Sequence, residues 1–105
     1  MPINNSSRGK FAPELIATMT GTPVVIGSLV YNPVVMYFDN LGTSTVTIFA
    51  DGVQWKTFGS GTALSIDCRS NHGLAPNYTF DIGTTFTGTG AAGDFSIAYT
   101  YAKEV

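Results

Sequence analysis

The sequence predicts an all-β protein, an antiparallel β-sandwich of jelly-roll-like form with about seven to eight short strands. Apolar residues recur at every second position through most of the chain, which is typical of half-buried strands. Turns rich in glycine separate these runs, and no helix of useful length interrupts them. A parallel α/β architecture is therefore excluded. The chain has 105 residues and is 44% hydrophobic, so it is one domain with a real core.

The first twenty residues are the least regular part of the chain. Residues 1–10 are polar, and Pro13 favours a short helical start within residues 11–19. That segment is too short to be stable alone. We therefore expect a non-regular N-terminal arm over residues 1–20, which orders by packing on its own sheet or on a neighbouring subunit. The β-sandwich domain is expected over residues 21–105.

The first half of the predicted domain contains a central strand and a hairpin. Residues 22–26 form a short β-branched run, and residues 33–38 are apolar on both faces. The second pattern is typical of a central strand, or of one that a partner covers. Residues 44–50 and 53–58 alternate on either side of Asp51-Gly52. This dipeptide favours a tight type I′ hairpin turn, because both of its positions need positive φ.

The second half supplies three further strands. Residues 62–68 alternate with Leu64, Ile66 and Cys68 facing inward, and residues 69–76 have a loop composition. Another period-two run places Tyr78, Phe80 and Ile82 on one face, and residues 84–87 either continue it or form a separate strand. A glycine-rich turn is expected at residues 88–93. The last strand has the clearest alternation, with one face made by Phe95, Ile97, Tyr99 and Tyr101.

Charge and targeting signals exclude several classes of protein. Charged residues make up 11% of the chain, against roughly 25% in an average soluble domain. The five Lys and Arg residues are scattered, so no basic stripe is available for a nucleic-acid backbone. The N-terminus lacks the pattern of a signal peptide, and no apolar run has the length of a membrane span. We expect synthesis in a reducing host cytoplasm and no contact with nucleic acid or membrane.

The residues that could carry chemistry do not form a recognisable active site. Residues 88–93 match the dinucleotide fingerprint G-x-G-x-x-G, but a strand follows where the pyrophosphate needs a helix N-terminus. His72 is the only histidine, so a usual zinc site lacks its second ligand. Cys68 is the only cysteine and is interpreted as a small buried apolar residue. The sequence therefore predicts no enzyme, no catalytic residue, no metal, no cofactor and no small-molecule substrate.

Four segments together resemble a known class of proteins. They read VMYFDN at 35–40, VQWKTF at 53–58, ALSIDCRSN at 63–71 and GDFSIAY at 93–99. The order W-K-T-F, D-x-R-x-N, glycine-rich loop and final strand is similar to small virion structural proteins of tailed bacteriophages, cyanophage-like ones included. The resemblance covers about residues 33–101 and leaves out residues 1–20. It implies a capsid decoration (cement) protein, commonly a homotrimer, that binds the major capsid protein from outside and stabilises contacts between capsid subunits.

The expected location is the capsid surface of the virion, and a surplus of apolar residues indicates where partners bind. Successive residues of a strand face opposite sides, so residues 33–38 cannot all enter one core. We expect the subunit or partner interface among eight residues: Phe11, Leu15, Ile16, Val35, Tyr37, Trp55, Tyr99 and Tyr101. The alternative function is a phage tail, fibre or adaptor component. In that role aromatic residues such as Trp55 would stack on a host glycan.

Overall fold

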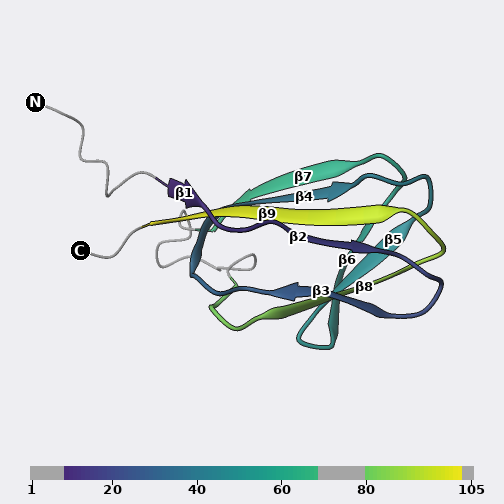
Figure 1. The fold of residues 1–105 in the computed structure, drawn as a ribbon, viewed down its shortest axis with the longest axis horizontal. Coiled ribbons are helices and arrows are strands. Elements are labelled where there is room, and N and C mark those ends of the chain that lie inside the picture. The colour runs from purple at the N-terminus through teal and green to yellow at the C-terminus, as the bar shows by residue number, and fades with distance from the viewer. Residues whose placement is uncertain (1–8, 69–79, 103–105) are drawn as a thin grey trace, which may run out of the picture.

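Two antiparallel sheets pack face to face in the computed structural model, which describes residues 9–68 and 80–102 (Figure 1). The five-stranded sheet contains β1 (Gly9–Phe11), β2 (Leu15–Thr18), β4 (Pro33–Asn40), β7 (Ala63–Asp67) and β9 (Asp94–Ala102). The four-stranded sheet contains β3 (Val24–Ser28), β5 (Val46–Ala50), β6 (Val53–Phe58) and β8 (Thr85–Gly90). The all-β sandwich predicted from the sequence is confirmed.

The order of the strands is that of a jelly roll. In the five-stranded sheet the order is β1-β9-β4-β7, and β2 follows β1 along the same edge of β9. The order in the four-stranded sheet is β3-β8-β5-β6. Apart from the β1–β2 edge and the β5–β6 hairpin, each strand is followed by one in the opposite sheet. The inner faces of both sheets therefore cover each other and share one core, as in other jelly rolls.

The N-terminal segment differs from the expected non-regular arm. From Gly9 onward it is β-structure, because the long strand β9 offers it a free edge: β1 pairs with residues 100–102 and β2 with residues 94–97. Between and after these strands, Ala12 N–H donates to the Tyr99 carbonyl at 2.9 Å and Met19 N–H to the Gly93 carbonyl at 2.8 Å. Residues 9–20 thus complete the sheet of the domain that was expected to begin at residue 21. Residues 1–8 lie outside the described residues.

The Asp51-Gly52 turn is confirmed as a two-residue hairpin. Asp51 has φ 50° and Gly52 has φ 83°, and the register pairs Ala50 with Val53. The carboxylate of Asp51 also accepts a hydrogen bond from Thr85 N–H at 2.9 Å. This second contact fastens the turn to the neighbouring strand β8.

Replacing Gly52 with valine is expected to destabilise the protein by about 1–2 kcal/mol. A Cβ at this position meets no other atom within 4 Å, so the expected cost is the strain of positive φ alone. Thermal denaturation measures it. The matched control is Gly52→Asn, because asparagine tolerates this conformation and should lose much less. Equal melting temperatures for the two variants would contradict the proposed origin of the loss.

The glycine-rich segment is partly strand. Strand β8 continues to Gly90, so the turn that follows it is shorter than expected. A Cβ on Gly88 would lie 3.1 Å from both the Met19 sulfur and the Ile26 Cδ1 atom, so glycine here makes room for these two core side chains. The G-x-G-x-x-G match therefore begins inside a strand, and strand β9 follows it.

The strand expected at residues 78–82 is not observed in its described part. Phe80 is half-buried, with its ring centroid 5.3 Å from that of Trp55, but residues 80–84 have no strand structure. Thr84 N–H closes a turn on the Asp81 carbonyl at 3.0 Å, and the Asn32 side chain accepts from Ile82 N–H at 2.9 Å. Local side-chain and turn contacts have thus replaced the strand ladder here. Residues 77–79 lie outside the described residues.

The core between the sheets is dominated by aromatic rings. Phe38 from β4 is fully buried, and its ring centroid lies 4.8 Å from that of Trp55 and 5.8 Å from that of Phe86. Phe58 meets Phe95 edge to face at 5.0 Å. These contacts use the inward positions of β4, β6, β8 and β9. The opposite positions of each strand consequently form the outer faces of the two sheets.

Candidate functional site

The outer face of the five-stranded sheet carries a group of exposed apolar side chains. On β4, Met36 and Phe38 point into the core, so Val35 and Tyr37 point outward. Tyr37 is 41% exposed and lies beside Ala98 of β9 on one side and Ser65 of β7 on the other. The central strand predicted to be apolar on both faces therefore has one face in the core and one on the surface.

Two residues from the N-terminal strands join this surface across β9. Phe11 pairs with Thr100, and Ile16 pairs with Ser96, which places both side chains on the outer face. Phe11 is 71% exposed and Ile16 is 49% exposed, and the Phe11 ring lies 6.3 Å from the Tyr37 ring. We call the set Phe11, Ile16, Val35 and Tyr37 the apolar patch. Such exposed apolar groups are typical of surfaces that bind another protein.

Carboxylates surround the apolar patch. Asp39 follows Tyr37 on the outer side of β4, Asp67 pairs with Val35, and Asp94 accepts a hydrogen bond from Thr18 at 2.5 Å. The only Lys and Arg residues of the described part are Lys10 and Lys56. Lys10 alternates with Phe11 and so faces away from the patch, and Lys56 belongs to the other sheet. Within the described part of the chain this face is apolar at its centre and acidic at its rim.

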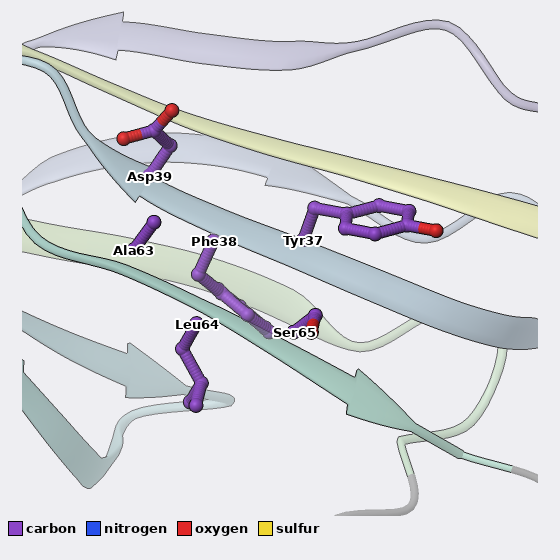
Figure 2. A pocket seen from close by; sticks show the side chains of 6 residues that line it. All are labelled: Tyr37, Phe38, Asp39, Ala63, Leu64 and Ser65. Carbon is purple, nitrogen blue, oxygen red and sulfur yellow. The ribbon is translucent and has the colours of Figure 1, made fainter.

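A shallow depression of about 350 Å³ lies between β4 and β7 at the border of the patch (Figure 2). It is lined by Tyr37, Phe38, Asp39, Ala63, Leu64 and Ser65. Figure 2 shows the Tyr37 ring and the Asp39 carboxylate on one side of β4 and the Phe38 side chain on the opposite side. The register pairs Asp39 with Ala63 and Tyr37 with Ser65. The space exists because these two β7 residues are small. We call it the β4–β7 depression.

Four of the eight predicted interface residues form the apolar patch, and the other four lie elsewhere. Leu15 points inward, where its side chain packs beneath Gly27, and Trp55 is half-buried against Phe38 and Phe80. Alternation on β2 explains the position of Leu15. On β6 the register shift opposite Trp55, between the pairs of Ile48 and Phe49, turns Trp55 to the same side as Phe58. Neither of these residues contributes to the outer face.

Tyr99 and Tyr101 stabilise one end of the sandwich. Tyr99 is fully buried, and its hydroxyl accepts hydrogen bonds from the backbone N–H groups of Val30 at 3.0 Å and Tyr31 at 3.3 Å. Tyr101 stacks on Tyr31 with ring centroids 3.8 Å apart. The side-chain hydrogen bond with Tyr31 raises the pKa of Tyr101 above its ordinary value. Tyr99 is therefore unavailable to a partner, and Tyr101 already has an aromatic neighbour.

Apart from Tyr37, the residues of the β4–β7 depression were not identified from the sequence as a site. Asp39, Ala63 and Ser65 are ordinary strand residues until the pairing of β4 with β7 places them together. That pairing joins segments more than twenty residues apart. The alternation of residues 62–68 gave the outward positions, but no local signal gives the register.

Neither candidate for nucleophilic or metal chemistry gains support from the described residues. Burial, and second the Asp67 carboxylate, raise the pKa of the Cys68 thiol to about 11, although a hydrogen bond with the Phe80 backbone lowers it. The thiol therefore stays protonated, and unreactive, around neutral pH. Residues 9–68 and 80–102 contain no group of three His, Cys, Asp or Glu that could hold a metal ion. His72 lies outside these ranges.

The outer face of the four-stranded sheet has a smaller depression of about 210 Å³. It is lined by Pro23, Phe49, Gly52, Thr87 and Thr89. One aromatic ring beside threonine hydroxyls is a surface on which a sugar ring could stack.

In the described part of the chain no helix is long and apolar enough to cross a membrane.

Comparisons with known proteins give one distant likeness. The chain matches no protein-family model and no curated protein. A solved structure described as "Bacillus endospore appendages form a novel family of disulfide-linked pili" is similar at a TM-score of 0.47 and 16% sequence identity. The likeness covers 99% of this chain and 98% of that chain.

Proposed function

We propose that this chain is a capsid decoration protein of a tailed bacteriophage, which binds the outside of the capsid and stabilises contacts between capsid subunits. The apolar patch carries the proposal, because it is an exposed apolar surface on a chain with little charge. The resemblance of residues 33–101 supplies the identity of the partner, the major capsid protein. Jelly rolls serve many functions, so the fold itself favours none of them. We propose no catalytic activity.

The apolar patch has the character of a docking surface. Its members stand in two rows that flank β9, with Phe11 and Ile16 on one side and Val35 and Tyr37 on the other. Each large apolar side chain that a partner covers contributes roughly 1.5–3 kcal/mol when its burial is complete. Tyrosine and phenylalanine are also enriched at protein interfaces. A sheet face that exposes such side chains suits a permanent contact with a second folded surface.

The number of copies per particle distinguishes decoration from the alternative function. Purified virions of the source phage should contain hundreds of copies of the chain, measured by gel densitometry against the major capsid protein. A tail or adaptor component would be present in a few copies and would contradict the proposal.

We also propose a homotrimer, so light scattering of the purified protein should give three times the 11.1 kDa chain mass. A monomer at micromolar concentration would contradict the trimer.

Removing the two rings of the patch should prevent capsid binding. The double variant Phe11→Ser, Tyr37→Ser is expected to bind capsids stripped of this protein at least about tenfold more weakly, because central aromatic residues dominate interface energies. The control is Val53→Ser on the four-stranded sheet, which removes an apolar side chain that is 70% exposed. Sedimentation with capsids gives both affinities. Equal binding by the two variants would exclude the patch as the docking surface.

The glycan-binding alternative rests on a different surface. The depression lined by Phe49, Thr87 and Thr89 is on the opposite outer face from the apolar patch. Phe49→Ala would therefore abolish glycan binding in a host-glycan array without affecting capsid binding. This variant separates the two functions on one protein.

A further inference from the structure

We propose that Tyr31 and Tyr101 form a site of oxidative cross-linking, at which a one-electron oxidant joins the two rings as dityrosine. Tyr31 lies between β3 and β4, and Tyr101 lies near the end of β9. The cross-link therefore joins segments that are far apart in the sequence. It is independent of the proposed function, because the contacts that carry it lie within one chain.

The two rings lie face to face. Their centroids are 3.8 Å apart and their planes differ by 5°. Most aromatic pairs have centroids roughly 4.5–7 Å apart, so this pair is unusually close. A hydrogen bond between the two side chains brings the hydroxyl ends of the rings together. The ring carbons next to the hydroxyl groups, at which phenoxyl radicals couple, are therefore neighbours.

Contacts of the surrounding backbone hold Tyr31 in this position. Its own N–H donates to the Tyr99 hydroxyl at 3.3 Å, and Pro33 pairs with Tyr101 in the register of β4 and β9. The Asn32 side chain accepts a backbone hydrogen bond at 2.9 Å from the turn before β8. The chain on both sides of the Tyr31 ring is thus fixed. Groups that the fold already holds together react faster than free ones, because no entropy is lost in bringing them into contact.

The pair is also open to an oxidant. Tyr31 is 40% exposed, and Tyr101 is half-buried. Tyr37 is equally exposed at 41%, but its ring neighbour is Phe11, which has no hydroxyl group and forms no phenoxyl radical. Tyr99 is fully buried. Among residues 9–68 and 80–102, only Tyr31 and Tyr101 therefore combine exposure with a stacked tyrosine neighbour.

The cross-linking step transfers two electrons in total. Each phenol gives one electron to the oxidant and its hydroxyl proton to water, which leaves two phenoxyl radicals. A carbon–carbon bond then forms between the two ring carbons next to the oxygens. Each of these carbons passes its hydrogen, as a proton, to the oxygen of its own ring, and both phenols are restored. Cys68 is the only cysteine, so this chain closes no internal disulfide, and the tyrosine pair provides a covalent link in its place.

The test is photo-oxidation of the purified full chain with ruthenium tris-bipyridyl, with persulfate as the final acceptor of the two electrons. The product should show dityrosine fluorescence, run as a monomer on a denaturing gel, and weigh two hydrogen atoms less than the parent chain. Trypsin should release residues 11–56 joined to residues 70–103. Tandem mass spectrometry of this product should place the bond between Tyr31 and Tyr101.

Three variants identify the reacting rings. Tyr31→Phe and Tyr101→Phe each keep an aromatic ring but remove one phenol, so each should abolish the monomeric cross-linked product. Tyr37→Phe is the matched control, because Tyr37 is as exposed as Tyr31 and has no tyrosine neighbour. This control should leave the yield unchanged.

A further measurement does not depend on the folding of any variant. The parent chain unfolded in guanidinium chloride should lose the Tyr31–Tyr101 product, because only the fold brings these rings together. The proposal is overturned if Tyr31→Phe keeps the yield of the parent, or if the unfolded parent forms the same product equally well. It is also overturned if the bond lies on another tyrosine, or if dityrosine appears only between separate chains.

Discussion

Replacing Asn40 with aspartate is expected to destabilise the protein by about 3 kcal/mol or more at neutral pH. Asn40 is 1% exposed, at the end of β4, and its amide group joins two loops at one end of the sandwich. The side-chain nitrogen donates towards the backbone carbonyls of Ser44 at 2.8 Å, Gly59 at 3.0 Å and Phe58 at 3.2 Å. Its oxygen accepts from Gly42 N–H at 3.1 Å.

The expected loss is large because the substitution turns the hydrogen-bond donor of the Asn40 side chain, its NH2 group, into an acceptor oxygen. An aspartate at this position presents a negative oxygen to three carbonyl oxygens, so it loses the donors and adds repulsion at a position that is only 1% exposed. Burial of this carboxyl raises its pKa in the folded state above the unfolded value. The penalty is therefore largest above the folded pKa. It shrinks as the pH falls through that value towards the unfolded pKa near 4.

Denaturant unfolding of the parent and the variant at several pH values measures this prediction. The control is Asn32→Asp, because Asn32 accepts a hydrogen bond from Ile82 N–H at 2.9 Å and a carboxylate can accept the same bond. That control should change the free energy of unfolding by less than about 1 kcal/mol. A pH-independent difference between the Asn40 variant and the parent would show that burial of the charge is not the cause.

The sequence predicted the parts of the fold that local patterns determine. Alternation located β5, β6 and β9, and Asp51-Gly52 predicted the turn, because both signals depend only on neighbouring residues. The strands β1 and β2 gave no comparable signal, since their stability comes from the edge of β9 more than seventy residues away. In such cases the pairing with a distant strand decides the structure, and the intrinsic strand propensity of the segment does not.

Local sequence patterns also predicted part of the candidate site and missed the part that depends on long-range strand pairing. The surplus of apolar residues in 33–38 indicated an uncovered face, and Phe11, Ile16, Val35 and Tyr37 do share one. Period-two patterns cannot say which segments are neighbours. The assignment of Tyr99 to an interface therefore overlooked its hydroxyl, which binds the backbone of residues 30 and 31. The β4–β7 depression needed the strand register, which no local pattern contains.

Replacing Gly42 with alanine is expected to destabilise the protein by about 1–3 kcal/mol, the usual cost of overpacking. Gly42, in the β4–β5 loop, faces Gly93, which precedes β9, and a Cβ on Gly42 would lie 2.7 Å from the Gly93 Cα. That neighbour is backbone and cannot rotate away, so one loop must move. Movement of Gly42 also strains its hydrogen bond to Asn40, which adds to the cost.

Gly59→Ala is the matched control for this prediction. Gly59 lies in another loop of the chain, and a Cβ there would meet only the Thr62 methyl group at an ordinary 3.7 Å. Alanine also restricts the unfolded chain more than glycine, so the control should be neutral or stabilising by about 0.4–1 kcal/mol. Thermal denaturation of both variants decides the question.

Because Gly42 and Asn40 share a hydrogen bond, the double variant Gly42→Ala, Asn40→Asp should lose less than the sum of the two separate losses. Strict additivity would mean that the close backbone contact and the buried amide stabilise this end of the sandwich independently.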